Sequence, residues 1–190
     1  MNTSGRSLPR SVRPATPADA QSCLEIYAPV VLNSHSSFET RVPDPEIYAR
    51  RIAEVMRDLP WLVCESGAKL VGYAYASRYR EREAYQWSVE VSAYVADGHL
   101  RTGVGRSLYG PLLDILRRQG YRNAYAVIAQ PNAPSAAFHE SMGFRYLCTY
   151  HEVGFKLGRW YDVGWWWLRL NDSTETPSAP ILYSRLHPAP

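Results

Sequence analysis

Apolar residues recur along this chain with two different periods, and each change of period marks a predicted element. Residues 23–31 and 48–56 have the helical spacing of an apolar stripe, so each is predicted to form a helix packed against a core. Both stretches follow residue pairs typical of helix starts. These pairs are Thr16-Pro17 and Asp44-Pro45.

The next segments change to the period of β-strands. Residues 61–66 and 69–77 are two β-type runs separated by Gly67-Ala68, which predicts an antiparallel hairpin. A long strand is predicted over 84–95, where alternation places Val89 and Val91 on one face and Glu90 on the other. Glu90 is the single charge on that polar face.

A third helix is predicted from Leu108, with Gly120 as its left-handed cap. Pro111 lies inside it and predicts a bend or an irregular turn, because proline lacks the N–H that bonds one turn back. A buried strand at 124–130, a short helix at 133–142 and a closing strand at 162–170 complete the order βααβββαβαβ.

Composition restricts the number of domains, the partners and the location that can be expected. The 190 residues are 46 % hydrophobic, enough for one domain, expected at 10–170, while the Ser- and Pro-rich ends, 1–9 and 171–190, are expected to be flexible. The formal charge of +3 is small and spread along the chain, so neither nucleic acid nor membrane is expected as a partner. Three distant cysteines and scattered histidines favour a reducing, cytoplasmic location and predict no metal site.

The stretch LRTGVGRSL, residues 100–108, lies between a predicted strand and a predicted helix. In that position backbone N–H groups and the positive end of the helix dipole face an anion together. Gly105-Arg106-Ser107 lacks the lysine of a Walker loop, and Leu108 stands where a dinucleotide fingerprint has its third glycine. The alternative is a tight turn that only reverses the chain.

This loop and the later NAPSAAFHESMGF, residues 132–144, resemble the acetyl-CoA site of the GCN5-related N-acetyltransferases (GNAT). Within that superfamily, stretches at 60–63, 72–76, 80–95 and 154–168 are similar to phosphinothricin and methionine sulfoximine acetyltransferases. The resemblance implies an α/β GNAT acyl-CoA N-acyltransferase fold with a mixed, splayed central sheet flanked by helices. It also implies direct transfer of acetyl from acetyl-CoA to the amino group of a small amino-acid-like acceptor in a ternary complex.

The resemblance assigns roles to individual residues. An ammonium group must lose a proton before its nitrogen can attack, and Glu90 is expected to accept that proton as general base, while His139 is expected to protonate the leaving thiolate. The N–H groups of Tyr94 and Val95 are candidates to stabilise the oxyanion. The expected acetyl-CoA contacts, these two included, are Tyr94, Val95, Arg101, Thr102, Gly103, Val104, Gly105, Arg106, Ser107, Asn132 and Ser135. The expected acceptor contacts are Phe38, Glu39, Arg80, Arg82 and Tyr85.

Three positions depart from the family pattern. Leu100 replaces the usual Gln or Arg before the glycine loop, which removes a side-chain contact, and Leu157 and Tyr161 replace frequent histidines, which leaves the acceptor open. The run Trp165–Trp167 alternates across a strand, so one or two rings are expected in the core and the other against a second copy in a homodimer.

Alternatives remain at this stage. Without the resemblance, Glu90 is equally compatible with an exposed or ion-paired strand residue; with it, catalysis is favoured. Arg80 and Arg82 remain compatible with a solvated charged segment even with the resemblance. The acceptor could be another amine, such as a peptide N-terminus or a polyamine. The domain could also be a non-catalytic module that binds acetyl-CoA.

Overall fold

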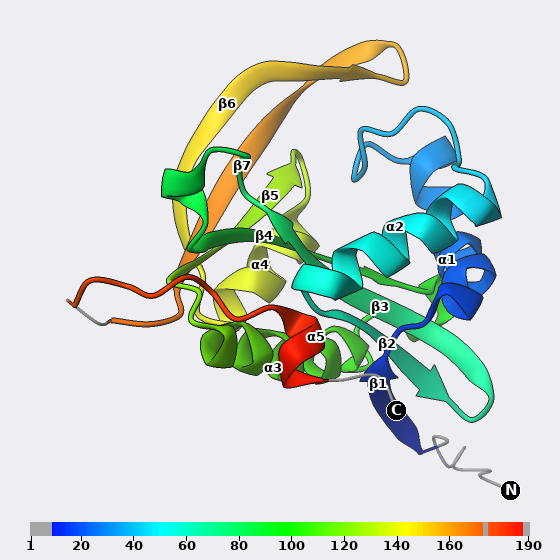
Figure 1. The fold of residues 1–190 in the computed structure, drawn as a ribbon. Helices are drawn as coiled ribbons and strands as arrows, with labels where there is room; N and C mark the ends of the chain where they lie inside the picture. The colour runs from blue at the N-terminus through cyan, green and yellow to red at the C-terminus, as the bar shows by residue number, and fades with distance from the viewer. Residues whose placement is uncertain (1–8, 173–174, 188–190) are drawn as a thin grey trace, which may run out of the picture.

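The computed structural model describes residues 9–172 and 175–187, which build one seven-stranded sheet flanked by helices (Figure 1). The strand order is β1-β2-β3-β4-β5-β7-β6, and only β4 and β5 run parallel. The strands are β1 (Arg10–Pro14), β2 (Trp61–Ser66), β3 (Lys69–Arg78), β4 (Ser88–Val95), β5 (Asn123–Ala129), β6 (Arg145–Lys156) and β7 (Arg159–Arg169). The helices are α1 (Ala20–Asn33), α2 (Pro45–Asp58), α3 (Val104–Gln119), α4 (Ala133–Ser141) and α5 (Tyr183–Leu186).

The predicted helix start at Asp44-Pro45 and the predicted cap at Gly120 are confirmed, whereas Thr16-Pro17 begins a 3₁₀ turn over Pro17–Asp19 and α1 starts at Ala20. Asp44 precedes α2 in an extended conformation, with Pro45 as the first helical residue. Gly103 and Gly120 enclose α3 with left-handed φ values of 91° and 92°. The helix continues through Pro111 without interruption.

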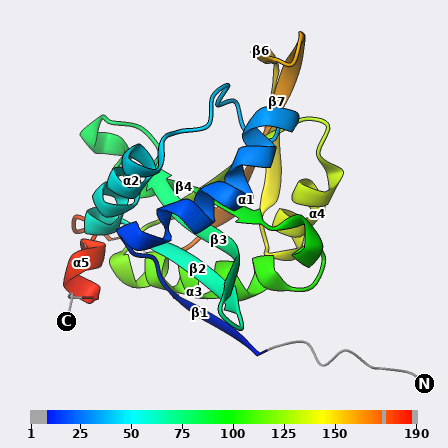
Figure 2. The same cartoon turned by 90° about the vertical axis from the view of Figure 1, so that its right-hand side faces the viewer.

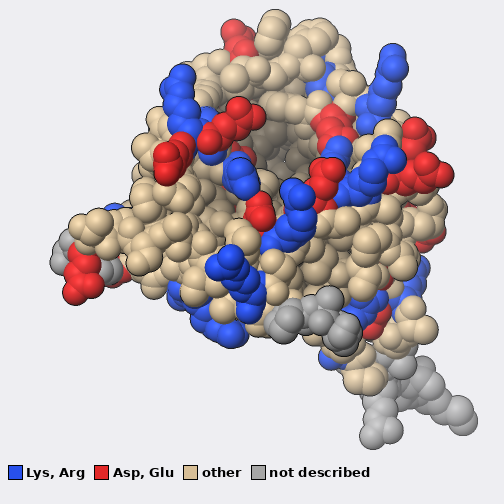
Figure 3. Space-filling view, in the orientation of Figure 1, with Lys and Arg blue, Asp and Glu red and all other residues tan. Residues whose placement is uncertain are grey.

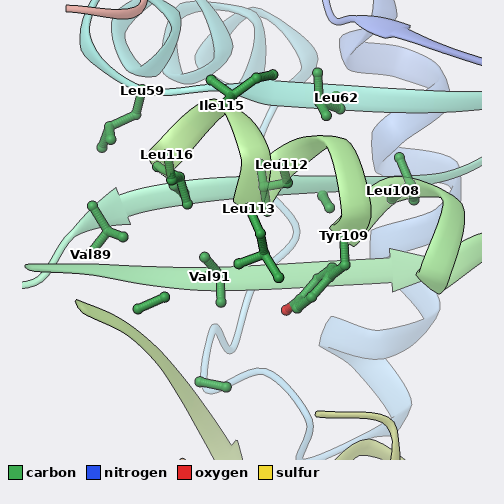
Figure 4. Close-up of a cluster of buried hydrophobic side chains, with 14 of the residues drawn as sticks. Leu59, Leu62, Val89, Val91, Leu108, Tyr109, Leu112, Leu113, Ile115 and Leu116 are labelled. Atoms are coloured by element: carbon green, nitrogen blue, oxygen red, sulfur yellow. The ribbon is translucent and has the colours of Figure 1, made fainter. Parts of the chain in front are cut away.

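Two hydrophobic clusters lie on opposite faces of the sheet (Figure 2). On one face α1 and α2 cover the aromatic side chains of β2 and β3. The hydroxyl groups of Tyr48 and Tyr73 form a hydrogen bond there, at 2.8 Å. On the other face α3 supplies a row of buried side chains that contact Val89 and Val91 of β4 (Figure 4). The predicted alternation of β4 is therefore confirmed, since its valines face this second cluster.

The sheet opens between its two parallel strands. β4 pairs with β5 over three residues only, Ser88–Glu90 against Asn123–Tyr125, whereas its pairing with β3 continues to Val95. From Val91 onward, the edge of β4 that pairs with β5 over Ser88–Glu90 is no longer paired with β5. The resulting gap confirms the splayed sheet expected from the sequence.

One strand is missing from the sequence prediction. β6 forms a hairpin with β7 through Leu157-Gly158, both with positive φ, and with α5 at the end the order is βααβββαβαββα. Figure 1 shows this hairpin as a long arm that projects from the sheet. Most of β6 is exposed and its register shifts twice, so its sequence carries no regular alternation of buried and exposed positions.

The tryptophan run lies within the fold. Trp165 and Trp166 are buried, as expected for rings that enter the core. The half-buried Trp167 donates a hydrogen bond from Nε1 to the side chain of Asn123 at 2.9 Å, and Arg169 lies over its ring. The third ring is therefore used inside the same chain.

The described part of the C-terminal segment differs from the expectation of a flexible tail. Tyr183 of α5 is buried in the hydrophobic cluster to which α3 contributes. Part of the expected flexible ends, namely residues 1–8, 173–174 and 188–190, lies outside the described residues.

Candidate active site

The glycine loop forms a turn that presents main-chain groups at the start of α3. Arg101 and Gly103 both have positive φ, 59° and 91°, and α3 begins directly after them. The first N–H groups of a helix have no partner within it, so those of Val104 to Arg106 point out of its end together with the positive pole of the dipole. This arrangement fits a diphosphate.

Two glycines let this turn sit close to its neighbours. A Cβ on Gly105 would lie 3.1 Å from the Phe138 ring of α4, and one on Gly72 of β3 would lie 2.7 Å from Val104. Gly72 was not among the predicted site residues. It brings the start of α3 against the sheet, and only its position in a strand signals a close approach.

Several residues around the loop are engaged by partners within the chain. Arg106 turns its guanidinium toward Ser141 at the end of α4, at 3.3 Å. The Ser107 N–H donates to Gly103 O inside the helix, so it is not free for a phosphate. Leu100 is exposed. Arg10 of β1 instead donates to the carbonyl of Thr102, and the sequence offers no signal that these two positions meet.

Glu90 lies at the point where β4 and β5 separate. Its side chain is 28 % exposed, and Arg80 Nη1 lies 3.4 Å from its Oε1. Burial raises the pKa of Glu90, and the charge and hydrogen bond of Arg80 oppose that rise without cancelling it. A carboxylate with a raised pKa, open to a gap in the sheet, is suited to accept a proton.

Aromatic side chains form a wall next to this carboxylate. The Arg80 guanidinium lies 4.5 Å over the Tyr79 ring and 5.8 Å over that of Trp165. Tyr125, the strand partner of Glu90, stacks on Tyr79 at 4.8 Å. Arg80 is among the residues predicted from the sequence, whereas these rings, which come from three separate segments, are not.

Arg82 and Tyr85 lie further along the same loop. Arg82 is exposed and caps the 3₁₀ turn Glu83–Tyr85, and Tyr85 meets Tyr79 edge to face at 5.7 Å. Among the described contacts, Arg80 alone of the three predicted loop residues touches Glu90.

Phe38 and Glu39, two of the expected acceptor contacts, lie in a segment that packs against the arm. Lys156, almost fully buried, donates from Nζ to the Ser37 carbonyl at 2.5 Å, and the Phe38 ring lies directly on the backbone of Gly154. Glu39 pairs with Arg51 of α2 at 2.7 Å rather than facing the gap freely.

Tyr161 lies beneath the same segment. The His35 ring stacks on it at 4.6 Å, and His35 Nε2 donates to the Pro131 carbonyl at 2.9 Å. Tyr161 is thereby buried, whereas Leu157 at the tip of the arm is exposed. Figure 3 shows a hollow on this face, beneath the arm, with Lys, Arg, Asp and Glu side chains around it.

Helix α4 holds the remaining predicted residues. Asn132 caps it by accepting from the Ser135 N–H at 3.2 Å and donates from Nδ2 to Ser36 Oγ at 3.3 Å. His139 is buried, and its Nδ1–H donates to the Ser135 carbonyl while its Nε2 accepts from the Tyr109 hydroxyl, both at 2.8 Å. Burial lowers the pKa of His139, so the ring is neutral with both nitrogens engaged.

Two further observations concern the described ranges 9–172 and 175–187 as a whole. None of their helices combines the length and apolar character needed to cross a membrane. Their His, Cys, Asp and Glu side chains form no group of three placed to hold a metal ion.

Comparison with known proteins adds independent information. Residues 12–165 match the family model for an acetyltransferase (GNAT) domain. The chain is 37 % identical to a phosphinothricin N-acetyltransferase of Streptomyces viridochromogenes, over 83 % of this chain and 86 % of that one. It is 33 % identical to an L-methionine sulfoximine/L-methionine sulfone acetyltransferase of Salmonella typhimurium, over 85 % and 95 %.

A solved structure agrees with both sequence relatives. The phosphinothricin acetyltransferase of Sinorhizobium meliloti, crystallised with acetyl-CoA, is similar with a TM-score of 0.85 and 31 % identity, covering 92 % of this chain and 98 % of that one. The strand order, the splayed β4–β5 pair and the glycine turn of α3 fit this likeness. The chain therefore belongs to the GNAT acetyltransferase family.

Proposed function

We propose that this enzyme acetylates the amino group of a small amino-acid-like acceptor of the phosphinothricin or methionine sulfoximine type, with acetyl-CoA as acetyl donor. The position of Glu90 carries the proposal: a half-buried carboxylate beside a guanidinium, where the sheet opens. Relatives and a solved neighbour named for these acceptors and for acetyl-CoA support it. The main-chain cradle at Gly103 fits the diphosphate of the donor.

In the proposed reaction Glu90 accepts the proton that the acceptor ammonium must lose. The freed nitrogen attacks the thioester carbonyl, so a C–N bond forms and the C–S bond breaks. The second proton of the attacking nitrogen passes to the departing sulfur, and CoA leaves as the free thiol. The Val95 N–H stabilises the oxyanion, because the splay leaves that edge of β4 without a neighbouring strand. The N–H of Tyr94, the other candidate, points to the opposite edge, toward β3, on the same side as that of Ala96, which donates to the Val71 carbonyl.

His139 enters this proposal with a revised role. Because the ring is neutral and both nitrogens are bonded, we assign it to holding Tyr109 and joining α3 to α4 rather than to direct protonation of the thiolate. Arg80 and Arg82 are proposed to bind the acceptor carboxylate or phosphinate, since a guanidinium fork matches both groups.

The arm supports a homodimer as part of the proposal. It carries a set of large apolar side chains that are about half exposed, more than an isolated soluble domain usually presents in one place. These are Tyr146, Leu147, Tyr150, Val153, Phe155, Leu157 and Trp160. Sedimentation at micromolar concentration is expected to give twice the mass of 21.6 kDa, and a monomer would contradict this part.

The central test is Glu90→Gln, with free thiol release as the readout. We expect turnover to fall by roughly 10²- to 10⁴-fold at neutral pH, the usual contribution of a general base, with acetyl-CoA binding retained in calorimetry. Glu54→Gln makes the same chemical change at an exposed site on α2 and is the control. Unchanged turnover in the Glu90 variant would remove this residue from the mechanism.

The acceptor class is tested separately with phosphinothricin, methionine sulfoximine, a peptide with a free N-terminus and a polyamine. We expect the first two to be turned over with the highest kcat/KM. Preference for the peptide or the polyamine would replace the proposed acceptor. Binding of acetyl-CoA without thiol release for any of them would favour a binding module.

A further inference from the structure

The C-terminal segment 175–187 lies beyond the 12–165 range of the family model, yet it is built into the domain. Tyr183 is 2 % exposed and belongs to the buried cluster that also contains Leu116 and Tyr121. Figures 1 and 2 both show α5, drawn in red, beside α2. The segment therefore has a fixed place against the helices.

Gln119, the last residue of α3, anchors this segment. Its buried amide nitrogen donates to the carbonyls of Asp58 and Ile181, both at 2.7 Å, and its main-chain carbonyl accepts from the Ile181 N–H at 2.8 Å. One side chain thus joins the ends of α2 and α3 to the C-terminal segment. Displacing a buried amide that donates two hydrogen bonds is energetically costly, because its donors would be left without partners.

The same segment reaches the loop that carries the proposed acceptor residues. Trp87 donates from Nε1 to the Ser178 carbonyl at 2.7 Å. Its own carbonyl accepts from the N–H groups of Arg122 and Asn123 at the start of β5. Trp87 lies between the loop 79–86 and β4, three residues before Glu90, so its position bears on both.

A cavity of about 300 Å³ lies where the loop and the segment meet. Pro180 and Leu182 of the segment form part of its wall, and Arg80, Arg82 and Tyr85 of the loop form another part. The loop is otherwise short of packing, because Arg82 and its neighbours are exposed. The C-terminal segment thus faces the loop across this cavity, and the hydrogen bond from Trp87 to Ser178 joins the two at its edge.

We propose that residues 175–187 act as a strap that holds the acceptor loop in its binding conformation, with Trp87 as the positioning residue. This inference rests on the proposed function. Ordering a mobile loop costs conformational entropy when a ligand binds, and a strap transfers that cost from binding to folding. The strap therefore lowers the KM for the acceptor and leaves the binding of acetyl-CoA at α3 unaffected.

The test compares Trp87→Phe, which keeps a ring but removes the N–H donor, with Trp167→Phe, which removes a similar donor that bonds outside the segment. We expect the acceptor KM to rise about three- to tenfold in the Trp87 variant, the usual effect of one hydrogen bond, while kcat and the KM for acetyl-CoA stay within twofold. The Trp167 variant is expected to keep all three values.

A second pair of variants removes the anchor itself. Tyr183→Ala takes away the buried ring, whereas Tyr183→Phe removes only a hydroxyl that has no partner among the described residues. We expect the alanine variant to raise the acceptor KM at least as much as Trp87→Phe and the phenylalanine variant to leave it unchanged. Folding is checked by the binding of acetyl-CoA, which both variants should retain.

Hydrogen exchange separates failure of the strap from failure of the proposed function. Without any acceptor, the amides of 79–87 should exchange faster in Trp87→Phe and Tyr183→Ala than in the parent, while those of 103–108 should not. Equal exchange in all proteins, or an equal acceptor KM, overturns the strap. No turnover by the parent chain, despite faster exchange in the variants, overturns the acceptor assignment alone.

Discussion

The two sides of the proposed active site are built in different ways. The side that fits the acetyl donor comes from one short segment, the turn 101–103 and the start of α3, and presents mostly main-chain groups. The proposed acceptor side is assembled from three segments far apart in the sequence: 34–42, 79–87 and the arm 154–161. Side chains make most of its contacts.

This difference explains why the departures from the family pattern matter unequally. A main-chain cradle tolerates a change such as Leu100, because N–H groups remain whatever the side chain. On the acceptor side, Tyr161 alters a surface that is made of side chains and is held in place by His35. We expect the donor to be shared with relatives, and the preferred acceptor to depend on these few contacts.

The sharpest test of the donor side is Gly103→Ala. A Cβ at φ 91° costs about 1–2 kcal/mol, which corresponds to about a five- to thirtyfold loss of acetyl-CoA affinity if the turn opens to relieve it. The acceptor KM should stay unchanged. Calorimetry with acetyl-CoA and initial rates at saturating donor measure the two effects.

Gly98→Ala is the matched control for this variant. Gly98 lies nearby, its φ is outside the left-handed region, and a methyl group added there would meet nothing within 4 Å, so acetyl-CoA affinity should not change. If both variants lost affinity equally, or if the Gly103 variant lost none, the left-handed turn at Gly103 would not be what binds the donor.

The acceptor side is tested by Gly154→Ala. The added Cβ would overlap the Phe38 ring, so the segment 34–42 must move away from the arm. We expect the acceptor KM to rise roughly threefold to tenfold, with acetyl-CoA affinity unchanged, because a loop can relax where a core cannot. Initial rates over a range of acceptor concentrations measure the effect.

The double variant Gly154→Ala with Phe38→Leu decides whether the contact is the cause. The smaller side chain leaves room for the added methyl group, so the combined effect on the acceptor KM should be smaller than the sum of the two single effects. Strict additivity would mean that the two positions act independently. The segment 34–42 would then not depend on the arm.

The same contrast governs what the sequence could predict. Helix α3, its cap at Gly120 and the face of β4 that carries Glu90 follow from local period and local chemistry, and all are confirmed. Contacts such as Lys156 with Ser37 join residues more than a hundred positions apart, and no local pattern encodes them. β6 was missed for a related reason, because a strand exposed on both faces has no alternation to detect.

The C-terminal segment shows the limit of composition. Its many Ser, Thr and Pro residues are typical of a flexible tail, yet Tyr183 and the backbone of Ile181 are enough to fix it against α3. One buried aromatic side chain outweighs the average of its neighbours. The partner that makes this possible is Gln119, which looks like an ordinary polar residue at the end of a helix.

The smallest effect expected is a shift in a pH profile, and it links Arg80 to Glu90. Burial raises the pKa of Glu90, and the positive charge and hydrogen bond of Arg80 partly oppose that rise. Glu90 accepts a proton only when ionised, so kcat/KM falls as the pH drops through this pKa. In Arg80→Gln the restraining charge is gone, the pKa of Glu90 rises further and the acid limb of log kcat/KM must move to higher pH.

Arg82→Gln separates this electrostatic role from acceptor binding. Burial and Arg80 are the described influences on the Glu90 pKa, so the Arg82 variant should raise the acceptor KM and leave the acid limb in place. Parallel pH profiles of the parent and both variants make the measurement. A limb that stays fixed in Arg80→Gln would show that the titrating base is not the carboxylate beside this guanidinium, and the two sides of the site would then meet at another residue than Glu90.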